Sequence, residues 1–516
     1  MQAANRVIKN TGILYAKMGI TMFISLYTTR LILGALGASD FGVFNVVGGA
    51  IAMLGFLDAA MSGATQRFMS FVEGEGNKEK QKSIFNIAIV LHFLISLLAG
   101  ILLLIGGFIF FHGMLNIPAN RIFAAHLIYY FMIVSTMFTI MTVPYDAVIN
   151  AHENMLYYSV VGIIESILKL IVAIVIVQVF FDKLILYGAL MAAISLAIML
   201  IMRVYCHRNY EECSFHPFHY WNKGLMIEMA TFAGWNFLGA ISTLLSGYGL
   251  GIVMNMFHGT IANAAQGIAN QISGQLGVLG TSIKKSLNPV IAKSAGAKDY
   301  KLMARSTVLG TKIIFFVVAV CFLPFMIEMP YILKLWLKNP PAQASVFCGL
   351  LLLTNLLDQL VLFLPQAIGA VGRIKGYQTV FSVLNLLPLL IAWIAFQHGA
   401  PAYTIYAITA MIAIVKDGTT IYFADKLNII PYGMYIRNVV GRCSVSFVLP
   451  MVICNLPGIF LDEGLFRLIM VVVISIVTYS ISAYFIGFNK EEQIFFRQKI
   501  AKIYSVRKHW NQFYKS

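Results

Sequence analysis

A stripe of polar side chains follows one face of the apolar segment 260–290. The residues of this face recur at steps of three or four, the period of an α-helix; they are Asn263, Gln266, Asn270, Ser273, Gly277, Thr281 and Lys284. Amides and hydroxyls can hydrogen-bond a polar ligand, and a lysine can bind an anion. Because the stripe is longer than helix packing requires, we expect it to line a cavity. Packing against a neighbouring helix is the alternative.

Three other apolar segments carry shorter polar faces of the same kind. They are 12–36, 41–70 and 226–256, and their polar residues include Lys17, Thr21, Ser25, Asn45 and Asn236. Lys17 and Lys284 each extend a polar face, so we expect them to give the cavity a cationic part. An ionised side chain at the centre of a bilayer costs at least about 2.5 kcal/mol and usually has a partner or a task.

Carboxylates inside apolar segments could couple transport to a cation, or could be buried structural partners. The candidates for coupling are Asp58, Asp146 and Asp358. Glu165 and Lys169 are spaced i, i+4 and are expected to pair with each other. The remaining basic side chains are expected to extend to the membrane surface; on the inner side these are Arg67, Lys285 and Lys312.

The composition shows which solvent surrounds these segments. Of 516 residues, 59% are hydrophobic and 11% are charged, whereas a soluble domain has about 25% charged residues. The chain must therefore be surrounded mainly by lipid. The net charge of +16 comes mostly from short connections between apolar runs, which favours membrane orientation over nucleic-acid binding. The six cysteines show no metal-binding spacing, so we expect no metal and no cofactor.

An apolar segment needs about 20 residues to cross a membrane. The sequence predicts about fourteen such spans, near 12–36, 41–70, 83–112, 121–149, 155–181, 184–206, 226–256, 260–290, 305–334, 343–370, 377–398, 401–424, 436–458 and 464–487. Most basic residues lie in every second connection between spans, on the same side of the membrane as both termini. By the positive-inside rule, both termini are therefore expected to be cytoplasmic. Residues 489–516 alternate aromatic and basic side chains, which is typical of a helix lying on an anionic membrane surface.

The sequence contains an internal repeat with an offset of about 220 residues. Residues 35–80 and 257–302 each pass from a glycine turn through a span rich in small residues to a Lys-bearing loop. Gly37 corresponds to Gly259, and Gly74 corresponds to Gly296. Six spans separate the copies, so the two halves have the same orientation and form a parallel repeat. Two bundles of this kind can enclose a cleft and rock about it, as transporters do.

The repeated segments also resemble a known superfamily. GTIANAAQGIANQISGQLGVLGTSIKKSLNPV is similar to the eighth-helix signature of the multidrug and toxin extrusion (MATE) branch of the MOP superfamily. LGASDFGVFNVVGGAIAMLGFLDAAMSGATQRFMS resembles the polysaccharide-export branch, the Wzx-like O-antigen flippases. The resemblance implies a V-shaped pair of six-helix lobes with a central cavity. Drug exporters of this superfamily often carry an acid in the first helix, where this chain has Lys17 instead.

These observations predict an all-α integral membrane protein with two six-helix lobes, residues 1–224 and 225–430. Two additional transmembrane helices, 431–488, and a basic amphipathic cytoplasmic tail, 489–516, complete it. The expected location is the bacterial cytoplasmic membrane.

The expected function is translocation of a polyprenyl-diphosphate-linked oligosaccharide by alternating access. The candidate coupling cation is a proton or a sodium ion. The alternatives are a cation-coupled multidrug exporter and, from another class, a membrane glycan polymerase or ligase. The outer connections are short for such an enzyme, and no nucleotide-binding or Ser-His-Asp motif stands in a suitable context. We therefore expect no catalysis, and partners limited to the glycolipid, membrane lipids and a coupling cation.

Overall fold

The structure is a computed structural model that describes residues 2–52, 55–109, 111, 119–337, 340–341 and 343–494. The side chains of Asn45, Asp58 and Asn263 lie outside the described part, so these three site predictions stay untested. The helices are α1 Gln2–Ala52, α2 Gly55–Glu75, α3 Lys78–Ile109, α4 Ile122–Ala151, α5 Met155–Gln178, α6 Lys183–Asn209, α7 Lys223–Gly296, α8 Tyr300–Leu337, α9 Ala344–Gln359, α10 Leu364–Val371, α11 Lys375–Gln397, α12 Thr404–Lys426, α13 Tyr432–Tyr435, α14 Arg442–Asn455, α15 Pro457–Phe460 and α16 Leu465–Ser482. Of two short π-helical turns, η3 Ile436–Gly441 joins α13 to α14, and η4 Ala483–Gly487 follows α16.

The described residues form helices and connections only, and the all-α membrane architecture is confirmed. Among the described residues, eleven helices are long and apolar enough to cross a membrane, or twelve if the bent pair α9 and α10 is one span. The two other predicted spans, 41–70 and 260–290, lie in helical segments that follow breaks in α1 and α7. The predicted number of about fourteen spans therefore agrees approximately with the structure.

The breaks in α1 and α7 occur at corresponding positions of the repeat. Gly37 has φ 73° and ψ 169°, and Gly259 has φ 74° and ψ −170°. This backbone region is open to glycine almost alone, because any Cβ would clash there. Two long helices that change direction at the same repeat position, with the same backbone geometry, support the internal duplication.

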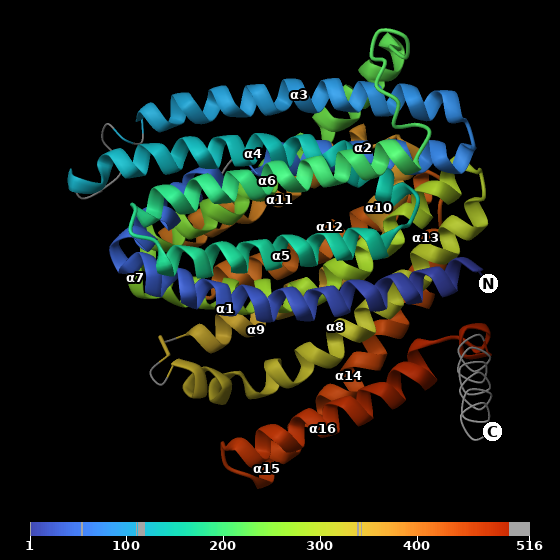
Figure 1. The fold of residues 1–516 in the computed structure, drawn as a ribbon. Coiled ribbons are helices and arrows are strands. Elements are labelled where there is room, and N and C mark those ends of the chain that lie inside the picture. The colour runs from blue at the N-terminus through green and yellow to red at the C-terminus, as the bar shows by residue number, and fades with distance from the viewer. Residues whose placement is uncertain are drawn as a thin grey trace, which may run out of the picture. The chain divides into compact units, whose positions relative to one another are not determined.

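The chain divides into two compact units. The first comprises Met1–Leu245, Lys284–Met303 and Gly369–Val383, and the second comprises Ser246–Ile283, Ala304–Ile368 and Leu384–Ser516. In the first unit α1 lies beside α5, and α4 lies beside both α3 and α6 (Figure 1). Its apolar core is built from α1, α3, α4, α5 and α6, and includes Ile32, Leu103, Ile128, Ala173 and Tyr187. The predicted division into two lobes of six helices stays a prediction.

An ion-pair network ties three segments of the first unit together at one end. The Arg121 guanidinium donates to Asp40 on α1 at 2.5 Å and to Asp182, the N-cap of α6, at 2.6 Å. Asp182 also accepts from the backbone N–H groups of Leu184 and Ile185. The Arg121 guanidinium holds the pKa of the Asp182 carboxyl below its usual range.

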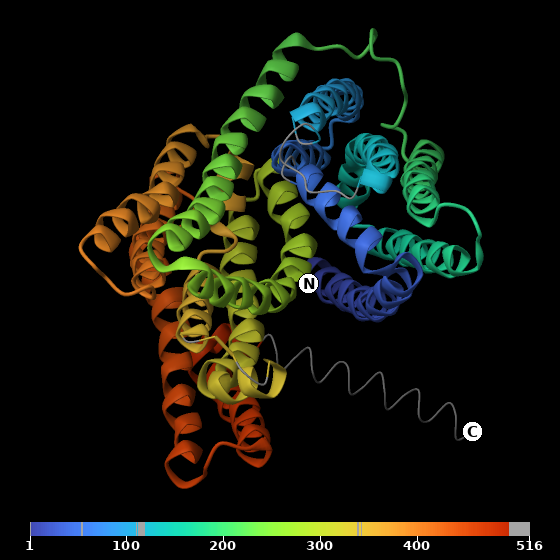
Figure 2. The same cartoon turned by 90° about the vertical axis from the view of Figure 1, so that its left-hand side faces the viewer.

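In the second unit the helices of the predicted C-terminal addition pack as a hairpin, α14 against α16 (Figure 2). Two ion pairs connect this addition to α8. Lys312 binds Glu492 at 2.9 Å, and Arg467 binds Glu328 at 2.8 Å. Lys312 and Glu328 are 16 positions apart, about 24 Å along a helix. The prediction that Lys312 extends to the membrane surface is wrong, because its side chain is fully buried against Glu492.

Candidate functional site

A polar cavity of about 210 Å³ lies among five helices of the first unit. It is lined by side chains of α1, α2, α4, α5 and α6, and the polar ones are Lys17, Ser62, Thr139, Thr142, Asp146, Tyr158, Glu165 and Ser195. Unpaired polar groups are costly inside a bilayer, so a cluster of this kind indicates a place for water, ions or a polar ligand.

Two lysines from different helices meet at one aromatic ring beside this cavity. The Nζ of Lys17 lies 4.2 Å from the centroid of the Tyr158 ring, and the Nζ of Lys285 lies 3.2 Å from it. An ammonium over the face of a tyrosine ring is stabilised by the ring quadrupole. Tyr158 therefore holds two positive charges close together, one from α1 and one from α7.

The lysine on α1 can reach this position because α5 has a glycine there. A Cβ added at Gly162 would lie 2.5 Å from the Nζ of Lys17, so a side chain at that position would displace the lysine. Lys17 thus reaches the wall of this cavity, and its role in binding a cargo stays a prediction. Thr21 and Ser25 continue the same helix: Thr21 donates to the carbonyl of Met18, and Ser25 is exposed.

Two carboxylates line the same cavity. Asp146 on α4 is close enough to interact electrostatically with Lys285 and Lys17. Glu165 binds Lys169 at 2.6 Å, and this confirms the predicted i, i+4 pair. Of the two predicted coupling acids whose side chains the structure describes, Asp146 lines this cavity. Asp358 lies in the second unit and binds Lys416 at 2.9 Å.

The structure selects Lys285, rather than its neighbour Lys284, as the partner of Tyr158. The interpretation that Lys285 merely extends to the membrane surface is therefore wrong. Lys284 is half-buried on α7. Adjacent residues on a helix point about 100° apart, so only one of the two lysines can face this ring. The spacing of residues along the chain could not predict the contact between Lys285 and Tyr158, because the two residues are far apart in the sequence.

The predicted polar stripe of α7 lies in the second unit, except for Lys284, which belongs to the first. Ser273 accepts a hydrogen bond from the Asn355 amide at 2.6 Å, which fits the alternative of helix packing. Gln266 is buried, with no hydrogen-bond partner for its Oε1 among the described residues, and Asn270 is exposed. In the first unit, Asn236 accepts from Gln378 at 3.0 Å.

Arg67 is a further residue whose role differs from the prediction. It does not extend to the membrane surface: it donates to the carbonyls of Gly369 and Ala370, each at 3.0 Å. Its guanidinium also lies over the rings of Phe68 and Phe232. Arg67 therefore connects α2 to the end of α10.

The corresponding glycines at the ends of α2 and α7 pack against each other within the first unit. A Cβ added at Gly74 would lie 2.7 Å from the carbonyl carbon of Lys293, and one added at Gly296 would lie 2.7 Å from that of Phe71. Each glycine thus meets the residue three positions before the other, which is a two-fold symmetric crossing of the repeated segments. Lys293 also binds Glu153, at 3.2 Å.

Comparisons with known proteins concern the fold. No protein-family model and no curated protein matches the chain. A MOP-superfamily transporter from Pyrococcus furiosus superposes with a TM-score of 0.68 at 12% identity, covering 83% of this chain and 96% of that one. An outward-facing MATE transporter gives 0.71 at 11% identity over 83% and 96%. The Vibrio cholerae MATE transporter VcmN, in its bent form, gives 0.64 at 18% identity over 84% and 98%. The resemblance found in the sequence is thus confirmed at the level of fold: this chain has the fold of the MATE transporters of the MOP superfamily.

Proposed function

We propose that this protein is an exporter of the flippase type, which moves a polyprenyl-diphosphate-linked oligosaccharide across the bacterial cytoplasmic membrane. The observation that carries the proposal is the pair of lysines, Lys17 and Lys285, gathered on Tyr158 at a polar cavity. The transporter fold supports movement of a cargo rather than its chemical conversion. The glycan would pass through the polar interior while the polyprenyl chain stays in lipid.

The charge balance of the cavity favours an anionic cargo. Glu165 is neutralised by Lys169, so the remaining charges are the ammonium groups of Lys17 and Lys285 against the carboxylate of Asp146. A diphosphate offers several acceptor oxygens, and ammonium groups donate charge-assisted hydrogen bonds to phosphate oxygens. The cluster therefore has one unbalanced positive charge available for a phosphate.

The same cluster offers a coupling group. Asp146 interacts with both lysines, so a proton or sodium ion bound to its carboxylate would leave the lysines free for the cargo. Release of that cation would return Asp146 to the lysines and weaken the hold on phosphate. This linkage would connect an ion gradient to release of the cargo during alternating access.

A cation-coupled multidrug exporter is the second candidate. It is favoured by the presence of two carboxylates, Asp146 and Glu165, on the wall of the cavity. The Pyrococcus furiosus transporter was described with a binding pocket of reverse polarity that suggests a different function. By analogy, the sign of the charge in the pocket would decide the class of cargo on this fold.

The proposal is tested by reconstituting the full chain in liposomes with a fluorescent polyprenyl-diphosphate oligosaccharide. Movement to the outer leaflet is followed by quenching with an impermeant reductant. Lys17→Gln and Lys285→Gln should each slow movement about ten-fold or more, as expected for one lost charge-assisted hydrogen bond. Lys301→Gln, at an exposed lysine of α8 outside the cavity, is the matched control. Unchanged rates in both cavity variants, or uptake of cationic dyes instead of glycolipid, would reject the proposal.

A further inference from the structure

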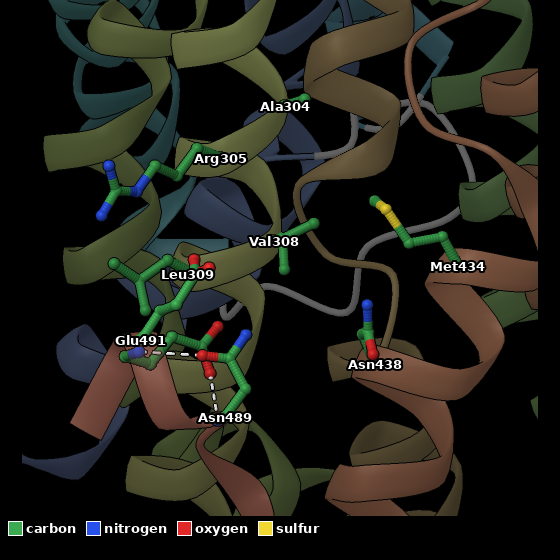
Figure 3. Close-up of a pocket in the computed structure, with 9 residues that line it drawn as sticks. Ala304, Arg305, Val308, Leu309, Met434, Asn438, Asn489 and Glu491 are labelled. Carbon is green, nitrogen blue, oxygen red and sulfur yellow. Dashed lines mark hydrogen bonds between the residues drawn. The ribbon is translucent and has the colours of Figure 1, made fainter. Parts of the chain in front are cut away.

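A second cavity, of about 340 Å³, lies in the second unit at the ends of three helical segments (Figure 3). It is formed by the second turn of α8, by α13 with η3, and by the residues that follow η4. Arg305 and Glu491 lie on one side of the cavity, and Met434 and Asn438 on the other. Its volume is within the range of about 300–1,000 Å³ that small-molecule sites occupy.

One wall of this cavity is held rigid by its own hydrogen bonds. The backbone N–H of Asn489 donates to the carboxylate of Glu492 at 2.7 Å, and the N–H of Glu492 donates to the Asn489 side chain at 2.8 Å. Glu492 also binds the fully buried Lys312 at 2.9 Å. The charge of Glu492 is therefore neutralised, and the wall is fixed to α8.

Apart from Glu492, the cavity is lined by two charged side chains of opposite sign, Arg305 and Glu491. Arg305 and Glu491 are exposed, and neither forms an ion pair with any residue that the structure describes. Asn438 adds an amide group, and Val308, Leu309 and Met434 add apolar surface. The site therefore presents a guanidinium, a carboxylate and an apolar wall to one ligand.

The position of the cavity narrows the chemistry of that ligand. The apolar spans Tyr300–Leu337 and Tyr432–Phe460 begin there, and the span Leu465–Gly487 ends there. Arg305 is five residues into α8, about 7 Å from its first residue. α8 has 38 residues, and about 20 suffice to cross the hydrocarbon core, so we expect its first turns to lie at the level of the phospholipid headgroups.

We propose that this cavity binds the headgroup of a phosphatidylethanolamine molecule, with its phosphate on Arg305 and its ammonium on Glu491. The ammonium of ethanolamine has N–H donors for a carboxylate, whereas the trimethylammonium of choline has none. An anionic lipid such as phosphatidylglycerol satisfies Arg305 but brings no cation to Glu491. The acyl chains would continue along the apolar side chains of α8.

The test uses the purified, delipidated full chain in detergent, titrated with phosphatidylethanolamine, phosphatidylcholine or phosphatidylglycerol of identical acyl chains, with binding followed by native mass spectrometry. Phosphatidylethanolamine should bind about ten-fold more tightly than either other lipid, the ratio expected for one charge-assisted hydrogen bond. Glu491→Gln should remove the preference over phosphatidylcholine, and Arg305→Ala should weaken binding of all three lipids.

Two variants serve as matched controls, and both should bind like the wild type. Arg437→Ala removes an exposed arginine that adjoins Asn438 but does not line the cavity, and Glu211→Gln removes an exposed glutamate of the first unit. Thermal unfolding without lipid shows whether each cavity variant is folded. Equal affinity for the three lipids, a preference for phosphatidylglycerol, or a preference that survives Glu491→Gln in a folded variant would overturn the proposal.

Discussion

Substitution of Gly296 by alanine should open the end of the molecule at which the repeated segments cross. An added Cβ would lie 2.7 Å from the carbonyl carbon of Phe71 and 3.2 Å from the backbone N of Glu75. Carbon atoms in contact normally stay about 3.5–4.0 Å apart, and the carbonyl oxygen of Phe71 lies closer still, so α2 and α7 must separate by more than about 1 Å. The obstacle is backbone, which cannot rotate away as a side chain can.

The expected magnitude follows from this overlap. Forcing a methyl group into a well-packed site costs about 1–3 kcal/mol. If the crossing is made only when this end is closed, the closed state loses this amount and the ratio of open to closed molecules rises about 5- to 150-fold. We expect this end to face the cytoplasm, so Gly296→Ala and Gly74→Ala should favour an inward-open state.

The accessibility of Ser70, one helical turn before Gly74, measures this change. Ser70 on α2 is fully buried, so a Ser70→Cys reporter should react slowly with a maleimide in the wild type and at least about five-fold faster with Gly296→Ala, the lower end of that range. Gly63→Ala and Gly277→Ala are the matched controls, because a Cβ at either position meets no atom within 4 Å. A variant that loses thermal stability without faster labelling would show that the crossing is purely structural and would refute the gating argument.

Two ion pairs give further predictions for thermal unfolding of the full chain in detergent. Glu492→Gln leaves the fully buried Lys312 unpaired and should lower the free energy of unfolding by about 3–5 kcal/mol. Replacing both residues by apolar side chains of similar size should restore most of this stability. Equal stability of the single and double variants would contradict the prediction. Because Arg121 lowers the pKa of Asp182, their ion pair contributes stability above the unfolded pKa of about 3.9 and loses it as pH falls through the lower, folded pKa. Arg121→Gln should therefore flatten the acid limb of the stability curve below about pH 4, and an acid limb as steep as that of the wild type would argue against this pairing.

Much of the architecture could be predicted because it depends on local properties of the chain. Scarce charge and long apolar runs indicate membrane helices, and the repeat offset pairs Gly37 with Gly259 and Gly74 with Gly296, in agreement with their backbone geometry and close contacts. The i, i+4 pair of Glu165 with Lys169 is likewise a local feature. Glycines at corresponding positions of a repeat can be found in a single sequence, and here they mark a shared helix break and a close helix crossing.

The contacts that define the candidate site are long-range and could not be predicted in this way. Nothing along the chain relates Lys285 to Tyr158 on another helix, so the sequence alone predicts that Lys285 extends to the membrane surface. The sequence predicts the same for Lys312, although Glu492, 180 positions later, neutralises it. Both assignments rest on the general tendency of long basic side chains to reach water, and a buried partner overrides that tendency.

Binding of an isolated polyprenyl diphosphate tests the central claim most directly. The wild-type chain in nanodiscs, titrated with undecaprenyl diphosphate, should bind it, and the double variant Lys17→Gln, Lys285→Gln should bind it about 100-fold more weakly, from the loss of two charge-assisted hydrogen bonds. Lys301→Gln should bind like the wild type. Equal affinity of the wild type and the double variant would show that the lysines on Tyr158 do not hold the cargo, and would contradict the account.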